Sequence, residues 1–187
     1  MSKDPCRGTG KPLTTYSLKK RRSKVRQRDV GQTVPAGSSF REWLAALPDI
    51  LAGRELVDLA RAVASARRRR RQVIAGLGAH VIKCGLSPWI IELMEEGVVT
   101  AVALNGAGAI HDFELAWAGS TSEDVGSALE DGSFGMARET ADFINEGARL
   151  GRRDGLGFGE SLGQLILREE LPNADLSILA AGARCNV

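Results

Sequence analysis

The sequence lacks the features that mark several classes of protein. Its three cysteines, Cys6, Cys84 and Cys185, are odd in number and widely spaced, with no Cys-x-x-Cys pair. This pattern argues against a zinc site or a disulfide framework, and it favours a reduced, cytoplasmic setting. No run of about 18 apolar residues occurs, so we expect no membrane span. The polar N-terminus has no apolar segment of the kind that a secretory signal contains.

Positive and negative charges nearly balance over the whole chain, but they are divided unevenly along it. Residues 1–72 contain 18 Lys or Arg and 6 Asp or Glu, whereas residues 73–187 contain 7 and 17, so the two parts carry net charges of +12 and −10. We predict a basic, partly disordered arm over residues 1–38 and an α/β domain over 39–187, which is acidic from residue 73 onward. An acidic domain suits a cationic amine ligand better than a polyanion.

The basic arm has several possible roles. No aromatic residue interrupts its charge run at 19–28, so stacking on single-stranded nucleic acid is not favoured. We interpret the arm as a solvated segment. Contact with an anionic surface, or docking onto the domain or a second subunit, remains an alternative.

Two helices are expected next. Ser39 followed by Glu42 has the spacing of a capping box, and Pro48 should end the helix that begins there. A second helix is predicted over 54–68, with an apolar stripe that includes Leu56 and Leu59. The arginines at 67–71 then lie at its C-terminal end, where the helix dipole favours cations.

The central part of the chain repeats a strand, a small-residue turn and a helix. Strands are predicted at 72–77 and 98–104, each followed by a Gly-rich turn, at 76–80 and 105–109, and helices are predicted at 87–96 and from about His111. This βαβα order indicates a parallel sheet with both turns at one edge, where such sheets bind ligands.

The C-terminal part is predicted to be helical, at 123–130, 136–150, 159–170 and 174–184. The pattern calls for a further strand, and none follows, which indicates either a fragment or a sheet completed elsewhere. Both histidines, His80 and His111, follow predicted strands at the ligand-binding edge. His111 and Asp112 are candidates for binding an amine or transferring a proton, and capping of the adjacent helix is the alternative role.

Two motifs resemble the deoxyhypusine synthase family. They are Gly-Leu-Gly-Ala-His-Val-Ile-Lys-Cys-Gly at 76–85 and Thr-Ala-Val-Ala-Leu-Asn-Gly-Ala-Gly-Ala-Ile-His-Asp-Phe-Glu at 100–114. The second turn is also similar to that of NAD-dependent ornithine cyclodeaminases, which share this fold. The resemblance covers about residues 70–120, and the helical region beyond is compatible with it.

The resemblance implies a Rossmann-like parallel sheet that binds NAD, here incomplete at the carboxyl end, in a homo-oligomer with sites at subunit interfaces. It implies a transferase-type reaction in which NAD takes a hydride from an amine-bearing carbon. The implied cofactor-binding residues are Gly78, Ala79, His80, Asn105, Gly106, Ala107 and Gly108, and the implied catalytic residues are His111 and Asp112.

Two other interpretations stay open. One is a cyclodeaminase-like lyase that also uses NAD. The other is a non-catalytic binding module whose basic arm engages an anionic partner. Steep salt dependence of nucleic-acid binding would be typical of that last case.

Overall fold

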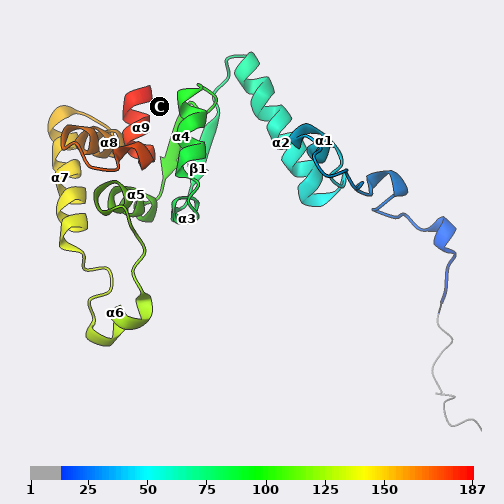
Figure 1. Cartoon of the computed structure of the whole chain (residues 1–187), viewed down its shortest axis with the longest axis horizontal. Coiled ribbons are helices and arrows are strands. Elements are labelled where there is room, and N and C mark those ends of the chain that lie inside the picture. The colour runs from blue at the N-terminus through cyan, green and yellow to red at the C-terminus, as the bar shows by residue number, and fades with distance from the viewer. Residues whose placement is uncertain (1–13) are drawn as a thin grey trace, which may run out of the picture. The chain divides into compact units, whose positions relative to one another are not determined.

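The structure is a computed structural model that describes residues 14–187 (Figure 1). It divides into an N-terminal unit up to Leu59 and a C-terminal unit from Ala60 onward, each considered separately below. Residues 1–13 of the predicted arm lie outside the described residues. The fold class is mixed α/β, with mostly helices and a small parallel sheet. In the described part of the chain, no helix combines the length and apolarity that crossing a membrane would require.

The N-terminal unit is built from short helices. It contains the 3₁₀ helices η1 (Leu18–Lys20) and η2 (Gln27–Asp29), the helix α1 (Phe40–Ala45) and the beginning of α2 (Leu51–Arg68). The predicted capping box of α1 is confirmed: Glu42 donates its amide to Ser39 Oγ at 3.3 Å, and its carboxylate accepts the Ser39 amide at 2.7 Å. The helix α2 begins three residues earlier than expected, at Leu51.

The sheet of the C-terminal unit contains β1 (Ile74–Leu77) and β2 (Ala101–Leu104). The two strands are parallel, and Leu77 pairs with Leu104 at their carboxyl ends. The prediction of strands reaching back to 72 and 98 was wrong. Gly97, with φ of 62°, ends the preceding helix, and the amides of Val98 and Val99 both donate to the Leu93 carbonyl instead of entering the sheet.

Helices follow both strands and pack on one face of the sheet, whereas Ile74, Gly76 and Ala103 are exposed. Their bounds are α3 (Ala79–Lys83), α4 (Ser87–Glu95), α5 (Gly106–Ala118), α6 (Val125–Asp131), α7 (Arg138–Asp154), α8 (Phe158–Arg168), the 3₁₀ helix η3 (Ala174–Leu176) and α9 (Ile178–Cys185). The helix α3 was not predicted from the sequence, which indicated a loop there. The helix α5 begins at Gly106 and not near His111, so most of the predicted second turn is its first helical turn.

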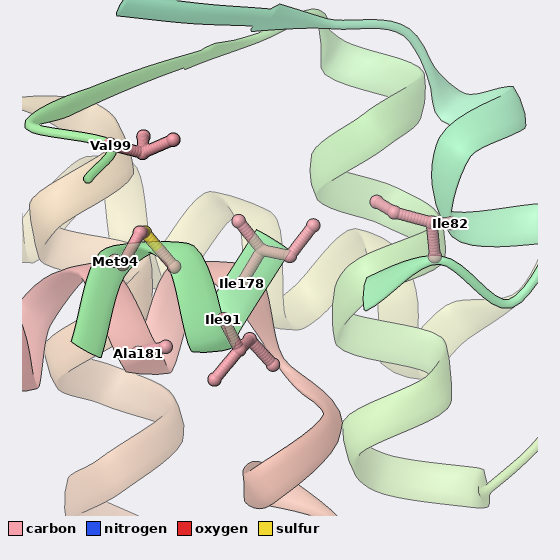
Figure 2. Close-up of a cluster of buried hydrophobic side chains, with 6 residues drawn as sticks. All are labelled: Ile82, Ile91, Met94, Val99, Ile178 and Ala181. Atoms are coloured by element: carbon pink, nitrogen blue, oxygen red, sulfur yellow. The ribbon is translucent and has the colours of Figure 1, made fainter. Parts of the chain in front are cut away.

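Two apolar clusters hold the C-terminal unit together. The first joins α3, α4 and α9 beneath the sheet and contains Ile82, Ile91, Met94, Val99, Ile178 and Ala181 (Figure 2). The second joins α5, α8 and α9 through Ala116, Ile166 and Ala180. Both clusters include α9, so this C-terminal helix is a central packing element of the unit.

Candidate functional site

The two small-residue turns lie side by side at one edge of the sheet, as predicted. This follows from the parallel register, because the last residues of β1 and β2 are paired. Gly78 is the N-cap of α3 and Asn105 is the N-cap of α5. A Cβ placed on Gly78 would lie 4.0 Å from Asn105 Nδ2, so the space between the two turns is about the size of one side-chain carbon at this point.

The second turn opens α5 with a side-chain cap. Asn105 Oδ1 accepts the amide of Gly108 at 2.8 Å, and the Asn105 carbonyl accepts the amide of Ala109 at 3.2 Å. These bonds do not use the amides of Gly106 and Ala107. Helix amides in such positions favour an anionic or carbonyl oxygen.

The two glycines of this turn have different surroundings. A Cβ on Gly108 would lie 3.3 Å from both Asn105 Oδ1 and Leu104 Cδ2, so the cap itself needs a residue without a side chain. A Cβ on Gly106 would meet no atom within 4 Å. Gly106 therefore faces open space, and a larger side chain there should not disturb the fold.

Gly106 is also one of the residues that line a cavity of about 580 Å³. This volume is within the range of sites for small molecules and cofactors. The cavity extends from β2 and the start of α5 to the beginning of α8, and along α9 to the residues that follow it. Its lining includes Val102, Leu104, Asn105, Gly106, Phe158, Glu160, Leu179, Gly182 and Asn186.

The walls of the cavity combine apolar side chains with nearly as much polar surface, to which Asn105, Glu160 and Asn186 contribute. Of the described residues that line it, Glu160 alone has a charged side chain. Glu160 is exposed in the first turn of α8, and its carboxylate accepts a hydrogen bond from Gln164 at 3.3 Å. A single carboxylate beside apolar walls can bind the cationic end of an otherwise apolar ligand.

Sequence reasoning missed Glu160. The available signal was the stretch Gly157-Phe-Gly-Glu160, in which small residues precede a carboxylate at the start of an amphipathic helix. This stretch resembles the small-residue turns at 76–80 and 105–109. No strand precedes it, so the pattern gave no reason to place it at the edge of the sheet.

The structure brings only some of the predicted cofactor-binding residues to the cavity. Asn105 and Gly106 line it, whereas Ala107 and Gly108 belong to the same helical turn without lining it. The residues of the first turn, Gly78, Ala79 and His80, are outside the lining. Ala79 is buried against the core, and His80 is exposed on α3.

Asp112 is fully buried and caps another helix. Its Oδ1 accepts the Ile178 amide at 2.8 Å, and its Oδ2 accepts the Ser177 hydroxyl at 2.5 Å and the Leu179 amide at 3.2 Å. Asp112 therefore joins α5 to the N-terminus of α9. Burial raises the pKa of Asp112 above its usual range, although these three hydrogen bonds oppose the change.

His111 belongs to a different polar cluster, on the side of α5 that faces α7. Its Nδ1 lies 2.6 Å from Thr121 Oγ1, and the Thr121 hydroxyl donates to Glu114. Because that hydroxyl donates to the carboxylate, its oxygen accepts from His111, which places a proton on Nδ1. Thr140 also donates to Glu114, at 3.2 Å.

Neither predicted catalytic residue lines the cavity. His111 and Asp112 hold segments that are distant in sequence: the segment leading to α6 in the first case and α9 in the second. Among the described residues, no group of three or more His, Cys, Asp or Glu side chains could hold a metal ion.

No protein-family profile matches the sequence, and no curated protein is significantly similar to it.

Proposed function

We propose that this protein is a Rossmann-like, NAD-binding protein of the deoxyhypusine synthase type that acts on an amine substrate. The observation that carries the proposal is the cavity at the carboxyl end of β2, lined by Asn105 and Gly106. In sheets of parallel strands, ligands bind at this edge. The motif that suggested NAD therefore coincides with a cavity of suitable volume.

The residues present fit the cofactor in three respects. Gly106 lets another molecule approach the backbone, because no atom occupies the position that a Cβ would take. The free amides at the start of α5 suit a phosphate or carbonyl oxygen. The apolar side chains of Leu104 and Leu179 provide walls for a flat ring.

In this proposal, Glu160 binds the amine of the substrate. Its carboxylate would attract and orient a cationic nitrogen at the end of the cavity formed by α8. When bound, NAD would accept a hydride from the amine-bearing carbon. Asp112 acts in this proposal as a positioning residue, since its hydrogen bonds fix α9 against α5, whereas His111 holds the segment that leads to α6.

Calorimetric titration with NAD⁺ tests the proposal, with Gly106→Val as the test variant. A Cβ at this position meets no atom within 4 Å, and Gly106 lines the cavity, so we expect a valine there to hinder a ligand that approaches the backbone. Gly76→Val is the matched control, because Gly76 lies in β1, outside the cavity lining, and its Cβ also meets no atom within 4 Å. We expect saturable binding by the wild type and by Gly76→Val, and a loss of at least about tenfold in Gly106→Val, equivalent to about 1.4 kcal/mol.

The same samples then test whether the protein acts on an amine substrate. Aliphatic amines added to the NAD-bound protein should produce an absorbance of reduced cofactor. A folded wild-type protein that does not bind NAD⁺ contradicts the proposal, and so does equal binding by the two valine variants. Binding without reduction by any amine would favour a non-catalytic binding module.

A further inference from the structure

The helix α2 has an apolar stripe whose two leucines are exposed. Leu56, Leu59, Ala60 and Val63 recur at the spacing of one helix face, yet α2 contains no buried residue. Leu56 is 50% exposed and Leu59 is 62% exposed. Most of the stability of helices in proteins comes from packing such a face, so an 18-residue helix with an open stripe is expected to have a partner.

The charge of α2 restricts what that partner can be. Residues 51–71 contain seven arginines against two acidic residues, a net charge of +5. Arg67 and Arg68 end the helix, and Arg69 to Arg71 follow it, so the helix itself carries four arginines against two acidic residues, a net charge of +2. A partner that covers the stripe must therefore combine exposed apolar side chains with negative charge.

The chain itself contains a surface of this kind. Between α5 and α7 it leaves the helical body in an excursion over residues 120–137, with α6 at its tip (Figure 1). This excursion contains four Asp or Glu and no Lys or Arg. Its large apolar side chains are exposed by between 45% and 76%, and they are Val125, Leu129, Phe134 and Met136.

The excursion is fastened at its stem. Thr121, at its beginning, and Thr140, just after its end, both donate hydrogen bonds to the same side chain, Glu114 of α5. At the tip, Glu123 accepts the amide of Gly135 at 2.7 Å. These bonds hold both ends of the excursion in place. Its exposed apolar side chains therefore form a surface on which another protein can dock.

We propose that the α6 excursion of one copy of this chain docks on the apolar stripe of α2 in a second copy. The two surfaces match in both respects: exposed leucines would be buried on each side, and the four acidic residues of the excursion would meet the arginine run 67–71 at the end of α2 and just beyond it. The contact joins two different patches, and a pair of reciprocal contacts between two copies would make a dimer. Nucleic acid would satisfy the arginines but leave the stripe exposed, and it is the competing outcome of the test.

Sedimentation velocity of the full chain tests this contact with one variant on each surface. Leu59→Asp places a negative charge in the stripe, and Leu129→Lys places a positive charge on α6. We expect the wild type to sediment as a dimer at micromolar concentration, and each variant alone to sediment with the monomer mass of 20.0 kDa. An equimolar mixture of the two variants should form a heterodimer, because each supplies the intact surface that the other lacks.

Ala62→Asp is the matched control, since Ala62 is exposed on α2 to one side of the stripe. It should leave the dimer intact, and circular dichroism should show equal helix content in all three variants. A monomeric wild type overturns the proposal, as do variants that remain dimeric or a mixture that remains monomeric. If the wild type is a monomer that binds duplex DNA through arginines 67–71, the stripe is not a docking surface for a second copy.

Discussion

The two units of the chain are stabilised in different ways. The C-terminal unit buries apolar side chains in two clusters, and α9 takes part in both. In the described part of the N-terminal unit, the one buried residue is a carboxylate, Asp29. That unit is held by local polar contacts: Asp29 accepts the Arg26 amide at 2.9 Å, its carbonyl accepts the Asp49 amide at 3.0 Å, and Arg54 lies 2.9 Å from the Asp49 carboxylate.

This difference predicts where mutations will act. Apolar burial supplies most of the free energy of folding, whereas an exposed ion pair such as Arg54–Asp49 contributes little. Substitutions in the C-terminal unit should therefore change its cooperative unfolding. Substitutions in the N-terminal unit should change only local helix content and local pKa values.

The largest effect is expected where two helices approach each other through a glycine. A Cβ on Gly163 of α8 would collide with the backbone carbonyl of Leu179 in α9 and lie 3.1 Å from the Ala183 side chain. We expect Gly163→Ala to lower the free energy of unfolding by about 3 kcal/mol, since backbone cannot move aside as a flexible side chain can. Thermal and urea unfolding followed by circular dichroism measure this change.

Gly159→Ala is the control for this prediction, because it makes the same substitution in the same helix. A Cβ there would meet Leu179 Cδ2 at 3.8 Å, which is ordinary contact. Alanine is also the better helix former, so we expect no loss of stability. Equal destabilisation by the two variants would show that close packing of α8 on α9 is not the cause.

The next effect depends on pH and comes from the buried cap of α9. Because burial raises the pKa of Asp112 from its ordinary value of 3.8, the folded state holds this proton more tightly than the unfolded state. The stability gained in this way is fully present below pH 3.8 and is lost as the pH rises through the folded-state pKa. Asp112→Asn removes this titration.

Urea unfolding of both proteins at a series of pH values measures the effect. The difference in free energy of unfolding, wild type minus Asp112→Asn, should fall as the pH rises above 3.8 and then become constant. Other titrating groups cancel in this difference. A flat or rising difference would mean that the three hydrogen bonds to Asp112 outweigh its burial.

Features set by neighbouring residues were predictable from the sequence. The Ser39–Glu42 capping box and the adjacent placement of the two turns depend on short-range patterns and on the geometry of parallel strands. The bounds of the strands were less predictable, because Val98 and Val99 look like strand residues but complete the end of α4. Apolar character alone does not distinguish these two outcomes.

The candidate site was predictable only in part. Asn105 and Gly106 were identified because a turn after a strand has a recognisable pattern. The role of Asp112 depends on Ser177 and Ile178, more than 60 residues away, and Glu160 reaches the cavity through the packing of α8 against α9. Such positions follow from tertiary packing, which one sequence does not reveal. Asp112 and His111 were predicted together as catalytic residues, but their side chains form hydrogen bonds with different partners.

The smallest effect is expected in the N-terminal unit, at the capping box of α1. The Ser39 hydroxyl and amide donate to Glu42 and lower the pKa of its carboxyl. Ser39→Ala removes the hydroxyl, so the Glu42 pKa should rise toward its ordinary value of 4.5, as measured by an NMR titration. The change should cost about 1 kcal/mol of local helix stability. The unfolding midpoint of the C-terminal unit should stay the same, and a matching fall in that midpoint would show that the two units unfold together.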